Sequence, residues 1–182
     1  MRIAEIGLTV NVIDQRGHGE NNNPLDDRVL EEIESATQFC RQYGKVVAVG
    51  HSSGGRFAMS SSADFSIGIS PALASDYGGR TRELLDNLRS YRVKELYRGI
   101  NHQIIKNLPE WKYNEQNPTM ILYGSRDVPE IVDKCKNIKC DVVDIFEIKN
   151  ALHNDIYLLE DTFTKVTEQL KKWFFICKNE QL

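Results

Sequence analysis

The sequence predicts an α/β protein in which a mostly parallel sheet is flanked by helices. An apolar run at residues 46–49, rich in valine, is typical of a strand buried on both faces of a parallel sheet. Strand-like and helix-like segments alternate along the chain, as they do when parallel strands are joined by helical crossovers. The chain also ends in a long amphipathic pattern, with apolar residues at Leu159, Phe163, Val166, Leu170, Trp173 and Cys177.

Composition narrows the class of protein. The 182 residues suit a single domain, residues 1–182, with an insert at about 71–117. Hydrophobic content is 41%, charged content is 27% and the net charge is −3, with no basic block of the kind that binds nucleic acid. No run approaches the ~18 apolar residues of a membrane helix. The four cysteines form no zinc-like spacing, so we expect reduced cysteines in a cytoplasmic protein.

The first half of the chain reads as strand, helix, strand. Residues 8–14 alternate like a strand and end at the Arg16-Gly17-His18-Gly19 turn. A helix is expected from Asp26 or Asp27 to about Tyr43, where Gly44 ends it. The apolar strand at 46–49 follows, and a short helix is expected from Gly54 to about Ser61.

The second half continues the alternation after an interruption. Residues 64–70, 118–124 and 140–148 are expected to be strands, and residues 129–137 a short helix with proline in its first turn. Between the first two of these strands, residues 71–117 are polar and only weakly periodic, with helical segments near 82–97 and 104–108. We expect this insert to form a small, mobile helical cap above Ser52. Its arginines are expected to lie mostly on a solvated helix face, with an anion clamp as the alternative.

A possible nucleophile follows the strand at 46–49. Residues 50–54 read Gly-His-Ser-Ser-Gly, a G-x-S-x-G pattern that places Ser52 at the tip of a tight strand-to-helix turn. The flanking glycines let neighbouring backbone pass without a Cβ clash, and the N–H of Ser53 is expected to point at negative charge that develops near Ser52. An ordinary glycine–serine turn is the alternative.

A serine hydroxyl needs a nearby base before it can attack a carbonyl. Of the four histidines, His153 alone follows a predicted strand at the edge where Ser52 lies. His51 and His18 are interpreted as structural, and His102 lies in the insert. Asp127 follows another strand at that edge, where it would orient His153.

These segments together resemble the α/β-hydrolase superfamily, in its serine esterase and thioesterase branch. Residues 12–19 (Val-Ile-Asp-Gln-Arg-Gly-His-Gly) resemble its strand and D-x-R-G-x-G segment, and Gly50 to Gly55 its nucleophile turn. Residues 121–127 resemble the strand and loop that supply the acid, and Ala151-Leu152-His153 the histidine loop. The resemblance implies an order of serine, aspartate and histidine, which Ser52, Asp127 and His153 follow.

One part of the family pattern is missing. Strands and an oxyanion loop normally precede the D-x-R-G-x-G segment, whereas only Met1 to Gly7 precede residues 8–14 here. We therefore expect a sheet shortened at the N-terminus to about five parallel strands, and an oxyanion hole of which Ser53 supplies one donor. Either residues 8–14 pair directly with the strand at 46–49, or a gap beside that strand exposes unpaired backbone and allows self-association through a sheet edge. Weak activity or aggregation of the chain alone is the expected consequence.

The sequence thus predicts a serine hydrolase that cleaves a small-molecule carboxylic ester or thioester through Ser52, His153 and Asp127, with no metal or organic cofactor implied. The alternative is a non-catalytic or weakly active α/β-hydrolase-like binding module. A phosphate-binding α/β protein is a third possibility, although no phosphate-loop motif supports it.

Overall fold

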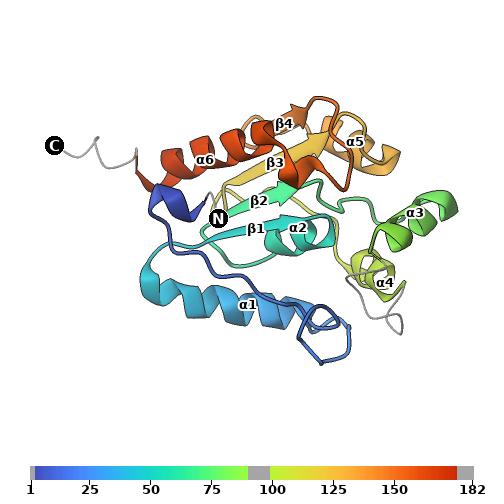
Figure 1. Ribbon diagram of the computed structural model, residues 1–182, viewed down its shortest axis with the longest axis horizontal. Coiled ribbons are helices and arrows are strands. Elements are labelled where there is room, and N and C mark those ends of the chain that lie inside the picture. The colour runs from blue at the N-terminus through green and yellow to red at the C-terminus, as the bar shows by residue number, and fades with distance from the viewer. Residues whose placement is uncertain (1–2, 90–98, 176–182) are drawn as a thin grey trace.

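A parallel sheet forms the centre of the molecule. The computed structural model describes residues 3–89 and 99–175. Four strands lie in the order β1-β2-β3-β4 (Figure 1): β1 Val47–His51, β2 Phe65–Ile69, β3 Thr119–Gly124 and β4 Asp144–Ile148. All three pairings are parallel. Four predicted strands are therefore confirmed, although β4 begins at Asp144 rather than at residue 140.

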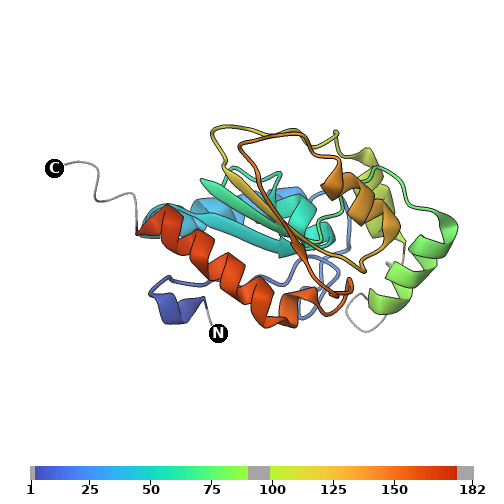
Figure 2. The ribbon, with the colours of Figure 1, turned by 90° about the horizontal axis from the view of Figure 1, so that it is seen from above.

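Helices cover both faces of this sheet. Their bounds are α1 Val29–Cys40, α2 Ser53–Ala58, α3 Gly79–Arg89, α4 Ile100–Asn107, α5 Pro129–Lys136 and α6 Glu160–Phe174, with short 3-10 turns at Ala4–Ile6, Arg41–Tyr43 and Ile156–Leu158. Strand β3 is buried on both faces: Ile121 packs in the core beneath α1, α2 and α5, and Leu122 packs in the core beneath α6. Figure 2 shows α6 running along one face of the sheet, and its core is separate from the core beneath α1, α2 and α5. The predicted final residue of the amphipathic pattern, Cys177, lies outside the described residues.

The prediction of a strand at residues 8–14 is wrong, and with it the expectation of a fifth strand. Residues 8–14 have no strand assignment, and Val12 and Ile13 are 76% and 44% exposed. Their alternation of β-branched residues favours a strand only when a neighbouring strand supplies hydrogen bonds. No such neighbour pairs with them among the described residues.

Strand β1 is consequently an edge strand. Val46 accepts a hydrogen bond from Phe65, and Ser52 donates one to Ile69, so the even-numbered residues of this stretch direct their backbone groups toward β2. Val47 and Val49 therefore direct theirs toward the open edge, and the Val49 side chain is 40% exposed. Of the two expected arrangements, the described part of the chain has the gap beside the strand at 46–49 and not its direct pairing with residues 8–14.

The insert between β2 and β3 contains α3 and α4, which lie beyond the carboxyl ends of the strands (Figure 1). Leu85 of α3 and Ile104 and Ile105 of α4 are buried in the core shared with α1, α2 and α5. The insert is therefore packed onto the domain through apolar side chains. The predicted helix at 82–97 extends into residues 90–98, which lie outside the described residues.

Candidate active site

Ser52 lies at the junction of β1 and α2 in an unusual backbone conformation. Its φ of 57° and ψ of −122° are rarely adopted by a residue with a side chain, and such strain costs about 1–3 kcal/mol. The turn closes tightly: a Cβ on Gly50 would lie 2.1 Å from the carbonyl oxygen of Gly54, and one on Gly55 would lie 2.9 Å from that of Gly50. Gly54 is not crowded, since its nearest neighbour would be 3.9 Å away. Gly50 and Gly55 are thus the glycines that this turn requires.

His153 lies beside Ser52 and beside Asp127. The Ser52 Oγ is 3.0 Å from Nε2 of His153, and the Nδ1 of that ring is 2.8 Å from Oδ1 of Asp127. Asp127 and His153 are buried, with 9% and 7% exposure, whereas Ser52 is partly accessible. The three predicted residues therefore meet at the carboxyl edge of the sheet. In this arrangement a serine proton can pass to the imidazole while the carboxylate fixes the ring.

Two further groups hold the Asp127 carboxylate. The Val128 N–H donates to Oδ1 at 2.7 Å, and the Ser70 hydroxyl, which is fully buried, donates to Oδ2. Burial by itself raises the pKa of Asp127, but the hydrogen bond and charge of His153, together with Ser70 and Val128, outweigh it and lower the pKa below its ordinary value. Asp127 is therefore held as a carboxylate.

Several solved structures resemble this arrangement of sheet and helices. An esterase from Thermogutta terrifontis matches with a TM-score of 0.58 at 15% identity, over 88% of this chain and 77% of that one. A monoacylglycerol lipase from Paleococcus ferrophilus matches with a TM-score of 0.54 at 18% identity, over 86% and 79%. A serine hydrolase involved in carbazole degradation matches with a TM-score of 0.60 at 16% identity, over 87% and 77%.

The chain has the α/β-hydrolase fold. No family model and no curated protein matches the sequence, so the likeness lies in the tertiary structure. The structural neighbours are esterases, lipases and serine hydrolases, at identities that establish the fold alone.

Within this α/β-hydrolase fold, the loops carrying the acid and the histidine are fixed to one another. A Cβ on Gly124 would lie 2.3 Å from the Ala151 carbonyl oxygen, so only glycine lets these loops approach so closely. Arg126 donates its N–H to the same carbonyl at 3.0 Å, and Asn150 donates its N–H to Ser125 Oγ at 2.8 Å. These contacts keep Asp127 and His153 at a constant separation.

His51, interpreted from the sequence as structural, contacts the histidine loop directly. Its Nε2 lies 2.7 Å from the backbone carbonyl oxygen of His153, and because a carbonyl can only accept, that nitrogen carries the proton. The His51 ring also lies against the rings of His153 and Tyr157, each with a centroid separation of 4.8 Å. The sequence placed His51 next to Ser52 but gave no signal of this contact 102 residues away.

Ser53, the predicted oxyanion donor, begins α2. Its amide therefore lies in the first helical turn, where no carbonyl four residues back is available within the helix. The Ser53 hydroxyl accepts a hydrogen bond from the side-chain amide of Asn101, a residue of α4 that is only 3% exposed. The insert is thus bonded to the nucleophile turn through a residue that sequence reasoning missed.

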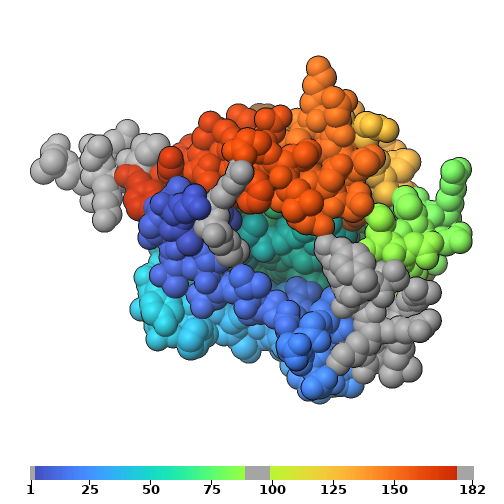
Figure 3. All heavy atoms as spheres, in the orientation of Figure 1, coloured from blue at the N-terminus to red at the C-terminus, as the bar shows by residue number. Residues whose placement is uncertain are grey.

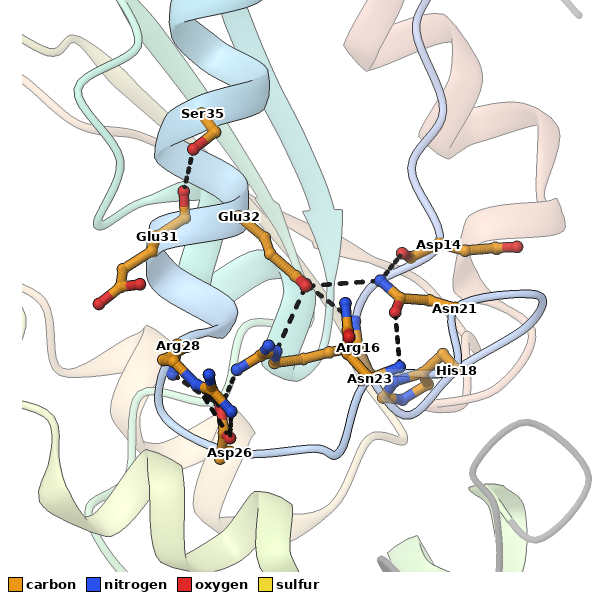
Figure 4. Close-up of polar contacts among 10 residues, drawn as sticks. All are labelled: Asp14, Arg16, His18, Asn21, Asn23, Asp26, Arg28, Glu31, Glu32 and Ser35. Carbon is orange, nitrogen blue, oxygen red and sulfur yellow. Dashed lines mark hydrogen bonds and ion pairs between the residues drawn. The ribbon is translucent and has the colours of Figure 1, made fainter.

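The D-x-R-G-x-G loop is held by its own residues and by α1 (Figure 4). The Asp14 carboxylate accepts the Glu20 N–H at 3.0 Å, and a Cβ on Gly19 would collide with that carboxylate at 2.4 Å. Arg16 is 5% exposed and forms ion pairs with Asp26 and, at 3.3 Å, with Glu32 of α1. Asp14 therefore anchors its own loop.

The surface over β1 is hollowed. In Figure 3 a depression lies between the blue N-terminal segment and the orange helix above it, and its floor has the teal colour of β1 and α2.

Among residues 3–89 and 99–175, no group of three or more histidine, cysteine or acidic side chains is placed to hold a metal ion. None of the helices within those residues is long and apolar enough to cross a membrane.

Proposed function

We propose that this protein is a serine hydrolase that cleaves a carboxylic ester or thioester. The observation that carries the proposal is the continuous hydrogen-bonded series from Ser52 through His153 to Asp127, with 3.0 Å and 2.8 Å between the bonded atoms. The strained backbone of Ser52 adds support, since such strain persists where the surrounding structure enforces it and is frequent at active sites.

In the proposed reaction, His153 Nε2 takes the proton of the Ser52 hydroxyl as Oγ attacks the carbonyl carbon. Asp127 stabilises the resulting imidazolium, and the Ser53 N–H donates to the oxyanion. His153 then protonates the departing alcohol or thiol, which leaves an acyl group on Ser52. Attack by water, with His153 again as base, releases the carboxylic acid and restores the serine.

The substrate class follows from the chemistry of the site and is supported by the neighbours. An ester or thioester leaves as an alcohol or thiol after one proton transfer, which a single histidine can supply. Structures of similar fold are described as an esterase and as a monoacylglycerol lipase. We therefore propose a small-molecule ester or thioester as substrate.

A fluorophosphonate probe and a p-nitrophenyl ester test the proposal. We expect the intact protein to be labelled and to release p-nitrophenol, and Ser52→Ala to lose both signals, with turnover falling ~10⁴- to 10⁶-fold. Ser35→Ala is the matched control, because Ser35 is an exposed serine on α1 whose hydroxyl donates to the Glu31 carbonyl of the same helix. Labelling that survives Ser52→Ala but is lost on substitution of another serine would contradict the assignment.

A binding module with the same fold is the second candidate. The open edge of β1 favours it, because unpaired strand edges are sites where extended segments bind. The same probe separates the two candidates: folded protein that is never labelled at Ser52 favours the module.

A further inference from the structure

Arg56 is a buried cation for which the described part of the chain supplies no anionic partner. It follows the nucleophile turn on α2 and is only 4% exposed. Its guanidinium donates to the Ser60 hydroxyl and to the Pro109 carbonyl oxygen, both of which are neutral acceptors. Within residues 3–89 and 99–175, no acidic side chain forms an ion pair with Arg56.

Burying a charged guanidinium costs desolvation free energy unless a negative charge lies beside it. An arginine stays protonated in proteins, so it cannot relieve its desolvation by becoming neutral. Burial lowers the pKa of Arg56, and burial is the sole cause of that shift, which agrees with the missing counter-charge. Among residues 3–89 and 99–175, these two acceptors use two of the five N–H groups of the guanidinium, and three are left for another partner.

Arg56 also lines a cavity of about 190 Å³. The other walls come from residues 72–75 after β2, from Ile105 of α4, from residues 108–110 that follow this helix, and from Lys134 of α5. Lys134 is half exposed at the cavity and lies 3.7 Å from Glu110, whose side chain is 73% exposed. The cavity therefore combines a buried cation, a half-exposed cation and one largely exposed carboxylate.

We propose that this cavity binds a small oxyanion, a carboxylate or a phosphate group, between Arg56 and Lys134. The planar guanidinium presents paired N–H donors that match the oxygens of either group, while Lys134 adds a point charge at the mouth. Glu110 competes for Lys134 when the site is empty. The cavity suits a ligand of a few non-hydrogen atoms.

This anion site is distinct from the proposed active site. None of Ser52, His153 and Asp127 lines the cavity. The two sites share backbone, because the Ser52 carbonyl accepts the N–H of Arg56 at 3.1 Å and the N–H of Ala72 at 3.0 Å. A bound oxyanion would therefore contact both segments whose N–H groups bond the Ser52 carbonyl, namely α2 and the segment that follows β2. It could act on the nucleophile turn as a small effector.

Calorimetry and thermal unfolding with inorganic phosphate and, separately, with acetate test the proposal, with sodium chloride at equal ionic strength as reference. We expect one saturable site and a melting temperature that rises with oxyanion concentration beyond the chloride value. Ser52→Ala should bind as the original protein does, which separates this site from catalysis. A rise no greater than that produced by chloride, or binding lost in Ser52→Ala, would overturn the proposal.

Variants that remove a positive or a negative charge should change the dissociation constant of the oxyanion in opposite directions. Lys134→Gln should raise the dissociation constant about two- to fivefold, and Glu110→Gln should lower it by a similar factor. Arg56→Lys, which keeps the charge but removes the fork, should raise it about tenfold or more. Lys136→Gln, a half-exposed lysine on the same helix that pairs with Glu147, is the matched control and should change nothing. Because the side chains of Lys134 and Glu110 are exposed, Lys134→Gln and Glu110→Gln test the site even if Arg56→Lys fails to fold. A dissociation constant that is the same in both variants would refute the proposal.

Discussion

The bond from Ser70 to Asp127 should contribute more to stability than an equally buried neutral bond in β2, the strand that Ser70 follows. Ser66 and Ser70 both have no exposed surface, and both donate or share a single side-chain hydrogen bond. Ser66 is paired with the hydroxyl of Thr119 at 2.9 Å, whereas Ser70 is paired with a buried carboxylate. The two serines therefore differ in the charge of the partner and in backbone, because Ser66 lies within β2 whereas Ser70 follows it with a φ of 46°.

We expect Ser70→Ala to lower the free energy of unfolding at pH 7 by about 1.5–3 kcal/mol, and Ser66→Ala by about 0.5–1.5 kcal/mol. The loss expected for Ser70→Ala is larger because this substitution leaves a buried carboxylate oxygen with one donor fewer. Urea unfolding followed by tryptophan fluorescence measures both values. In an ester assay, Ser70→Ala should also lower kcat with little change in KM, because the aspartate that orients His153 is less firmly held.

The pH dependence separates the charged bond from simple packing. The folded-state pKa of Asp127 is lowered, so its contribution is complete above the unfolded value of about 3.9 and is lost as pH falls through the folded pKa. Removing the Ser70 donor raises the folded pKa, so the penalty of Ser70→Ala should be full at pH 7 and should shrink as pH drops below about 4. Equal losses for the two variants at pH 7, or a Ser70→Ala penalty that does not change with pH, would refute this reasoning.

Three other predictions follow from single contacts. Gly50→Ala should abolish folding or destabilise the protein severely in urea unfolding, because its Cβ would lie 2.1 Å from backbone, whereas Gly54→Ala should cost no more than about 1 kcal/mol. His51→Phe should lower kcat about five- to tenfold through loss of the bond to the His153 carbonyl; an unchanged kcat would show that the ring acts only as packing. The open edge of β1 should promote self-association, and Val49→Lys should reduce it in light scattering at high protein concentration, whereas a variant that associates as strongly would place the contact elsewhere.

Sequence patterns determined the elements that depend on local chemistry. Apolar patterns identified β1 to β4: a continuous run at residues 46–49 predicted β1, and apolar residues alternating with small ones predicted β2. The order of Ser52, Asp127 and His153 at strand ends predicted that they would meet, since parallel strands bring their carboxyl ends to one edge. The glycines around Ser52 predicted a tight turn, although the crowded glycine after the serine is Gly55 rather than Gly54.

Tertiary structure decided whatever depends on a partner distant in sequence. Residues 8–14 have a strand-like pattern, but a strand is stabilised by hydrogen bonds to a neighbour, and β1 does not pair with them. Ser70 and His51 gained their contacts with Asp127 and His153 only when strands and loops 57 and 102 residues apart were brought together. The sequence did not distinguish Arg56 from any other helix arginine, because the burial of a side chain is a property of all the segments that surround it.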